Sequence, residues 1–89
     1  SVIGADIKDH EIVVFDFSDA RYLDDSAAMV IEQLLDVARE ADTSVIVVGL
    51  SGTVAEMINT LGVLRAVPKD HVGDDLPQAR RIARRILED

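Results

Sequence analysis

The sequence predicts an α/β domain with a small, mostly parallel sheet and helices packed on it. Two short apolar runs rich in Val and Ile, residues 12–17 and 45–48, are typical of strands that are covered on both faces. Residues 27–41, which lie between these runs, carry apolar residues at helical spacing. Two such strands joined by a helix form a right-handed crossover, and the strands then lie parallel.

The first strand leads through a polar loop to the start of the first long helix. Asp24, Asp25 and Ser26 stand directly before the helical pattern. Because Asp and Ser are frequent N-caps, we predict that Asp25 or Ser26 caps the helix. The unpaired N–H groups and the dipole of a helix N-terminus also favour a negative group. Asp24, Asp25, Ser26 and Ala27 therefore form a candidate phosphorylation or partner-contact site, and simple capping is the alternative.

The first helix is predicted to bury one apolar stripe, and charged residues fall mainly on its other side. The stripe consists of Ala27, Val30, Ile31, Leu34, Leu35, Ala38 and Ala41. The helix closes at residues 42–44 without a glycine. The second strand then follows at residues 45–48, where four β-branched residues stand in a row.

The second helix begins soon after the second strand. Thr53, with Glu56 three residues later, predicts a capping box, and Gly62 is placed to end the helix in a left-handed conformation. Ser51, Gly52 and Thr53 also resemble a phosphate-binding turn at the end of a strand. The Lys and the spaced glycines of a P-loop are absent from this turn. Capping and a weak nucleotide or anion contact therefore both remain open for these residues.

The last helix is predicted to begin near Asp74 and Asp75, with Pro77 in its first turn. Its core face consists of Leu76, Ala79, Ile82, Ala83, Ile86 and Leu87. Its solvent face carries Arg80, Arg81, Arg84 and Arg85. These arginines either balance the acidic residues of the chain or contact acidic lipid headgroups at a membrane surface.

Composition limits the function classes that fit the chain. Its 89 residues are enough for one small domain, and the net charge of −8 argues against nucleic acid as a partner. The chain has no cysteine, which excludes disulfides and thiolate zinc sites. No apolar run approaches the ~20 residues of a membrane span. His10 and His71 have no second ligand at metal-site spacing, so we expect them on surface loops and predict no metal, cofactor or catalytic residue.

Three motifs in order resemble the STAS domain family, and together they cover roughly residues 11–87. They are Tyr22-Leu23-Asp24-Asp25-Ser26-Ala27, then Val48-Gly49-Leu50-Ser51-Gly52-Thr53-Val54 followed by Leu61-Gly62-Val63-Leu64, and finally Asp75-Leu76-Pro77-Gln78-Ala79. The first motif resembles the Asp-Ser-Ser/Thr-Gly turn of the family. It departs from that turn at Asp25, where the family has Ser, and at Ala27, where the family has Gly.

Within the family, the chain looks most like the C-terminal cytoplasmic domain of SulP-type anion transporters. The resemblance implies a non-catalytic regulatory domain, soluble in itself, at the cytoplasmic face of the cell membrane. Its expected partners are the transmembrane domain of the parent transporter and a cytosolic protein, and the anion is of the sulfate, bicarbonate or dicarboxylate class. The alternative is an anti-sigma-factor antagonist, a phospho-switch that is regulated at Ser26.

The family normally has two strands and a short helix before the strand that starts at Ile12, and this chain lacks them. We therefore expect residues 1–89 to be a single STAS-like domain that is truncated at its N-terminus. A sheet with two confident strands exposes an apolar edge, which predicts self-association or a need for the absent segment. Val2, Ile3 and Ile7 offer the alternative of a short edge strand within residues 1–11.

Overall fold

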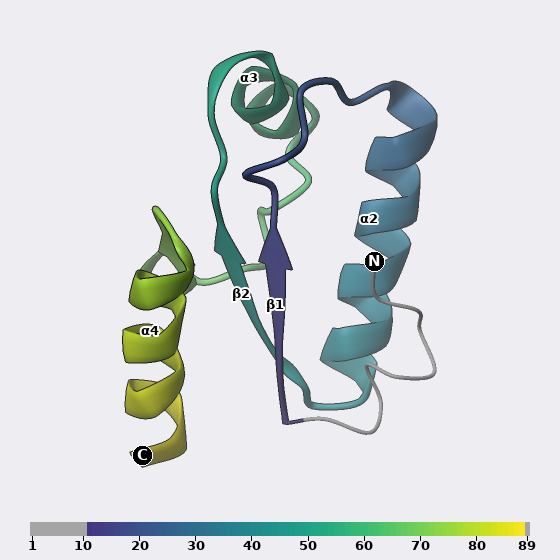
Figure 1. Cartoon of the computed structure of the whole chain (residues 1–89). Helices are drawn as coiled ribbons and strands as arrows, with labels where there is room; N and C mark the ends of the chain where they lie inside the picture. Colours follow the sequence, from purple (N-terminus) through teal and green to yellow (C-terminus); the bar gives the residue numbers. More distant parts are fainter. Residues whose placement is uncertain (1–10, 89) are drawn as a thin grey trace.

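A three-stranded parallel sheet lies between helices on both of its faces (Figure 1). This computed structural model describes residues 11–88. Its strands are β1 (Ile12–Asp16), β2 (Ser44–Val48) and β3 (Val72–Gly73), in the order β1-β2-β3. The α/β class and the parallel pairing of the two apolar runs are therefore confirmed. The predicted edge strand of Val2, Ile3 and Ile7 lies outside the described residues.

The third strand was not predicted from the sequence. β3 pairs with the end of β2, Val72 opposite Val47 and Gly73 opposite Val48. The Gly49 N–H extends this pairing, because it donates to the Asp74 carbonyl at 3.1 Å. A strand of two residues carries no alternation of its own, so only the neighbouring β2 defines it. As a result, β2 is the central strand and β1 lies at one edge of the described sheet.

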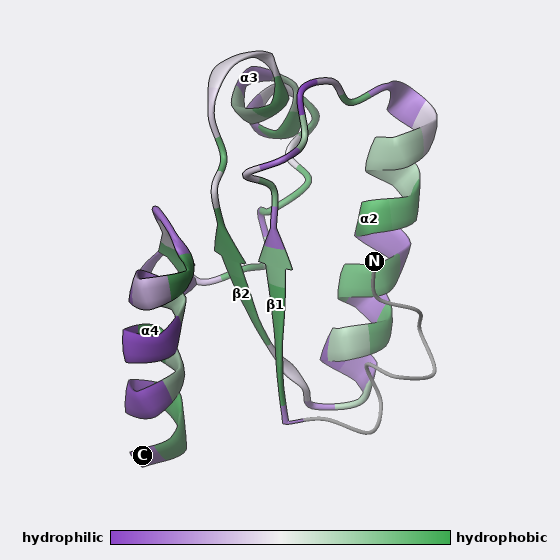
Figure 2. Ribbon diagram, in the orientation of Figure 1, coloured by the Kyte–Doolittle hydropathy of each residue, from purple (hydrophilic) through white to green (hydrophobic). Residues whose placement is uncertain are grey.

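The alternation of side chains along β2 divides the core into two layers. Val45 and Val47 pack against α2 (Asp25–Glu40) and α3 (Gly52–Leu61). Ile46 and Val48 pack on the other face against α4 (Leu76–Glu88). Figure 2 shows the hydrophobic strands between these helices. Both faces of β2 are thus buried, which is why its sequence is an unbroken apolar run.

Helix α2 begins earlier than predicted. Its N-cap is Asp24, whose extended backbone precedes the helix and whose side chain accepts a hydrogen bond from the Ala27 N–H at 2.8 Å. Asp25 and Ser26 are already helical, so the prediction that one of them is the cap is wrong. Of the predicted stripe, Leu35 and Ala38 are buried, and Ile31 and Leu34 pack partly buried on the core. Val30 is exposed, and Ala28, which was not predicted, is buried.

Helix α3 does not start with the predicted capping box. Its N-cap is Ser51, which makes no side-chain capping hydrogen bond, and Thr53 already lies inside the helix. The Thr53 hydroxyl instead donates to the Arg21 carbonyl at 3.4 Å. The predicted left-handed termination is confirmed, because Gly62 has φ 64° and ψ 30°. Thr53 therefore links the start of α3 to the loop after β1 and does not cap its own helix.

Two side chains at the start of α4 cap the helix reciprocally, as in a capping box. Asp75 Oδ1 accepts from the Gln78 N–H at 3.0 Å, and Gln78 Oε1 accepts from the Asp74 N–H at 2.6 Å. The prediction of Leu76 and Leu87 as core residues is wrong, since both are exposed. At 100° per residue these two leucines lie at the flank of the face that contacts the sheet.

Candidate functional site

The loops that follow β1 and β2 lie together at the carboxyl end of the sheet. Figure 1 shows both loops above the heads of the strand arrows, where the first leads to the first turn of α2 and the second leads to α3. In open parallel sheets, loops at this end commonly carry the functional residues. The two segments predicted as sites, residues 24–27 and 51–53, both belong to this end of the sheet.

Close backbone packing fixes the position of these loops. Asp16 Oδ1 accepts a hydrogen bond from the Ser18 N–H at 2.9 Å and so turns the chain after β1. Gly49 lies directly against this turn with φ +80°, and a Cβ at this position would stand 2.6 Å from the Ser18 nitrogen. Thr53, at the start of α3, donates to the Arg21 carbonyl and so joins this helix to the loop after β1. Arg21 lies three residues before the N-cap of α2. The start of α2 is therefore held by both loops.

A carboxylate already occupies the N-terminus of α2. Asp24, Asp25 and Ser26 are exposed, and Ala27 is half-buried. Asp24 accepts from the Ala27 N–H, which is one of the groups that an external anion would use. Because two carboxylates, Asp24 and Asp25, directly precede Ser26, a further free anion would meet like charge there. The geometry at residues 24–27 therefore suits contact with a protein better than capture of a free anion.

Large apolar side chains are exposed beside Ser26. Tyr22 is 77% exposed, Met29 60% and Val30 53%. Met29 and Val30 follow Ser26 by three and four residues, so all three share one face of α2. We call Ser26, Met29 and Val30 the α2 surface; the exposed Tyr22 lies two residues before the N-cap of α2. The sequence did not predict this surface, because Val30 was assigned to the buried stripe.

Ser51, Gly52 and Thr53 are all exposed. The Thr53 hydroxyl is used by the Arg21 carbonyl, and no atom lies within 4 Å of the position that a Cβ on Gly52 would take. These residues are the N-cap and the first two residues of α3, so they form its exposed N-terminus. A weak nucleotide or anion contact through them remains a prediction.

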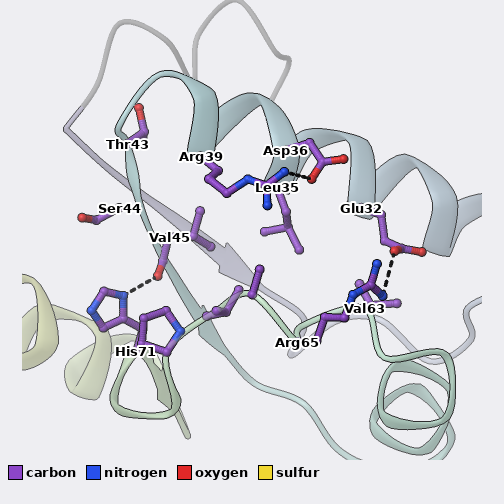
Figure 3. A pocket seen from close by; sticks show the side chains of 13 residues that line it. Glu32, Leu35, Asp36, Arg39, Thr43, Ser44, Val45, Val63, Arg65 and His71 are labelled. Carbon is purple, nitrogen blue, oxygen red and sulfur yellow. Dashed lines mark hydrogen bonds and ion pairs between the residues drawn. The ribbon is translucent and has the colours of Figure 1, made fainter.

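A hollow of about 420 Å³ lies at the opposite end of the sheet, between α2, the start of β2 and the segment 63–68 (Figure 3). Leu35, Val45 and Val63 form apolar walls of this hollow. Two ion pairs lie at its rim, Arg39 with Asp36 at 3.2 Å and Arg65 with Glu32 at 3.6 Å. Since the two arginines are matched by two carboxylates, the rim has no surplus charge that would select an ion.

His71 also lines this hollow and is fixed by a hydrogen bond. It belongs to a 3₁₀ turn, η1 (Lys69–His71), and its Nδ1 lies 3.0 Å from the Val45 carbonyl. A carbonyl oxygen can only accept, so Nδ1 carries the proton. The prediction of a surface position is wrong for His71, which is half-buried and joins η1 to β2. His10 lies outside the described residues.

Comparison with known protein families places this fold and this site in context. The family model of the STAS domain matches residues 3–79. This chain belongs to the STAS domain family. The Bicarbonate transporter BicA of Synechocystis sp. is 31% identical to this chain over 77 residues. The match covers 86% of this chain and 14% of the transporter, so the chain spans a small part of that relative. The resemblance to a STAS domain of an anion transporter, seen in the sequence, is confirmed.

Both departures of the STAS domain from the family turn have a structural explanation. Ala27 stands where the family has Gly, and its backbone is helical, so a Cβ is accepted without strain. Asp25 stands where the family has Ser and occupies the first helical position, where a negative charge is favourable. None of the helices that residues 11–88 form has the length and apolar content needed to span a membrane.

Proposed function

We propose that this STAS domain is the cytoplasmic regulatory domain of a SulP-type anion transporter and that it performs no chemistry itself. The similarity to a bicarbonate transporter supports this proposal. The observation that carries it is the α2 surface, where apolar side chains stand exposed around a polar, acidic turn. Such a surface binds a protein partner, and bicarbonate is the first anion to test, before sulfate and dicarboxylates.

The α2 surface has the composition of a small protein interface. Full burial of an exposed Val or Met side chain is worth about 1.5–3 kcal/mol. Because Met29 and Val30 are 60% and 53% exposed, their burial on binding contributes at most about 2–3 kcal/mol together. Asp24 and Asp25 add negative charge at the rim, and this charge selects a basic partner. The cytoplasmic loops of membrane proteins carry an excess of Lys and Arg. The transmembrane domain of the parent transporter therefore fits as a partner, and a basic cytosolic protein fits the same chemistry.

The free edge of β1 supports a second contact, self-association. Phe17 donates to the Val48 carbonyl and Ser44 donates to the Glu11 carbonyl, so the odd-numbered residues of β1 direct their backbone groups toward β2. The N–H and C=O groups of Ile12, Val14 and Asp16 therefore face away from β2. Within residues 11–88 no strand pairs with this edge. A second copy of the chain can add its own strand there.

The proposal is tested on the full-length protein that carries this domain. We expect a region with several hydrophobic spans in the same polypeptide and uptake of labelled bicarbonate into vesicles that contain the protein. Labelled sulfate and a labelled dicarboxylate, measured in parallel, identify the anion class. A polypeptide without a multi-span region would refute the transporter assignment.

A phospho-switch at Ser26 is the second candidate, because the exposed Ser26 shares its helix face with Met29 and Val30. A phosphate adds close to two negative charges beside Asp24 and Asp25, which would expel a partner from the α2 surface. Incubation with candidate anti-sigma-factor kinases, followed by intact-mass measurement, tests this function, with Ser26→Ala as the control. Absence of a mass increase that depends on Ser26 counts against the switch.

A further inference from the structure

The outer face of α4 carries a dense group of positive charges. Arg80, Arg81, Arg84 and Arg85 are all exposed. The ion pairs found within residues 11–88 use the arginines of α2 and of the segment after α3, and none of them involves α4. We propose that these four arginines, the α4 surface, dock the domain on a membrane that contains anionic phospholipids. This inference rests on the proposed function, which places the domain beside a membrane.

The α4 surface points directly away from the sheet. Ala79 and Ile82 are buried against Ile46 and Val48, and at 100° per residue the four arginines lie on the opposite side of the helix. Figure 2 shows hydrophilic stretches along the outer side of α4. The helix has 13 residues and is therefore about 20 Å long. It presents a row of charge along its outer face, which suits a planar array of phosphates.

Charge distribution gives this docking a direction. The whole chain carries −8, whereas α4 has four arginines against Glu88. The Debye length is about 8 Å at physiological ionic strength. The molecule measures 34 × 25 × 21 Å, and α2 with its acidic residues lies on the other side of the sheet (Figure 1). Screening therefore weakens the repulsion of the acids on α2. The nearest acids, Asp74 and Asp75, precede α4, and Arg84 and Arg85 lie about two turns further along the helix, so attraction dominates when this part of α4 faces the lipid.

Side-chain chemistry favours lipid over an acidic protein surface. The guanidinium group binds phosphate and carboxylate oxygens alike in a bidentate manner, so the arginines alone do not distinguish the two surfaces. The exposed Leu76 and Leu87 flank the arginines and can contact the interfacial region of the bilayer. Because α2 lies on the opposite side of the sheet, this orientation turns the α2 surface away from the bilayer, where the second partner proposed above, a basic cytosolic protein, can reach it.

The test is cosedimentation of the 89-residue chain with vesicles, either of phosphatidylcholine alone or of phosphatidylcholine with phosphatidylserine. The variant R80Q/R81Q/R84Q removes three charges from α4. The control R21Q/R39Q/R65Q removes three exposed arginines elsewhere and changes the net charge by the same amount. Thermal unfolding by circular dichroism shows that both variants are folded.

We expect binding to the phosphatidylserine vesicles only, with an affinity that falls as salt is raised. The α4 variant should lose roughly 100-fold in affinity, since each of the three removed basic residues near an anionic surface contributes about a factor of five, whereas the control should bind like the unmodified chain. Equal losses in both variants, or no binding of the unmodified chain, would overturn the proposal. Binding to soluble polyglutamate without binding to vesicles would assign the α4 surface to an acidic protein instead. None of these results depends on anion uptake, so the proposed function is judged separately.

Discussion

Replacement of Gly49 by Ala should destabilise the domain strongly, because Gly49 fixes the loops at the carboxyl end of the sheet. Its φ is +80°, and an Ala in a left-handed conformation costs about 1–2 kcal/mol. The added Cβ would also stand 2.6 Å from the Ser18 nitrogen and 2.8 Å from Asp16 Oδ1. Such overpacking adds about 1–3 kcal/mol, so the expected loss in the free energy of unfolding is about 2–5 kcal/mol.

Gly52→Ala is the matched control for this substitution. Gly52 has a φ of +56°, but no atom lies within 4 Å of its Cβ position. It should lose about 1–2 kcal/mol, the cost of the backbone conformation alone. Urea unfolding followed by far-ultraviolet circular dichroism measures both free energies, and the difference between the two variants isolates the close approach of Gly49 to the β1 loop.

The two variants also differ in the expected melting temperature. In a domain of this size, 1 kcal/mol corresponds to roughly 4–8 °C. Gly49→Ala should therefore melt at least several degrees below Gly52→Ala. Equal stabilities of the two variants would show that the loops after β1 and β2 do not pack as described, and the geometry of the candidate site would then be incorrect.

Three further substitutions test the cap, the second core layer and the strand edge. Asp24→Ala should lower the free energy of unfolding in urea by about 1 kcal/mol because it removes the N-cap of α2, whereas Asp25→Ala should have less effect. A larger loss for Asp25→Ala would show that Asp25 is the cap, as the sequence had suggested. Ile82→Ala should cost about 2–5 kcal/mol because Ile82 is buried against β2, and Leu87→Ala, at an exposed position, should lie within about 0.5 kcal/mol of the unmodified chain. Val14→Pro should lower the mass seen by sedimentation, since the Val14 N–H faces the free edge and not β2; an unmodified chain that is already monomeric would refute pairing at this edge.

The sequence predicted the type and order of the main elements because each carries a strong local signal. The Val and Ile runs of β1 and β2 and the helical spacing of residues 27–41 are independent of the rest of the chain. Gly62 ends α3 as predicted, since few other residues adopt a left-handed conformation easily. The four arginines of α4 are exposed as predicted, because the apolar spacing fixes which face meets the sheet.

The features that the sequence did not predict depend on contacts between distant segments. β3 exists through its pairing with β2, and the partner of Thr53 is Arg21, 32 residues away. The hollow beside His71 is formed by three separate segments. On α2, the buried face includes Ala28 and leaves Val30 exposed, and periodicity alone does not decide between neighbouring apolar residues at the border of a buried face. The α2 surface could therefore be recognised only in the structure.

An uptake experiment on the full-length protein in vesicles tests directly whether the α2 surface regulates transport. Met29→Asp places a charge on this surface, and Thr60→Asp places the same charge on an exposed position of α3. Neither side chain is buried, so both variants should fold and insert in equal amounts. We expect Met29→Asp to change the rate of labelled bicarbonate uptake at least several-fold and Thr60→Asp to leave it unaltered. Equal uptake by the unmodified protein and by Met29→Asp would show that the α2 surface does not regulate transport.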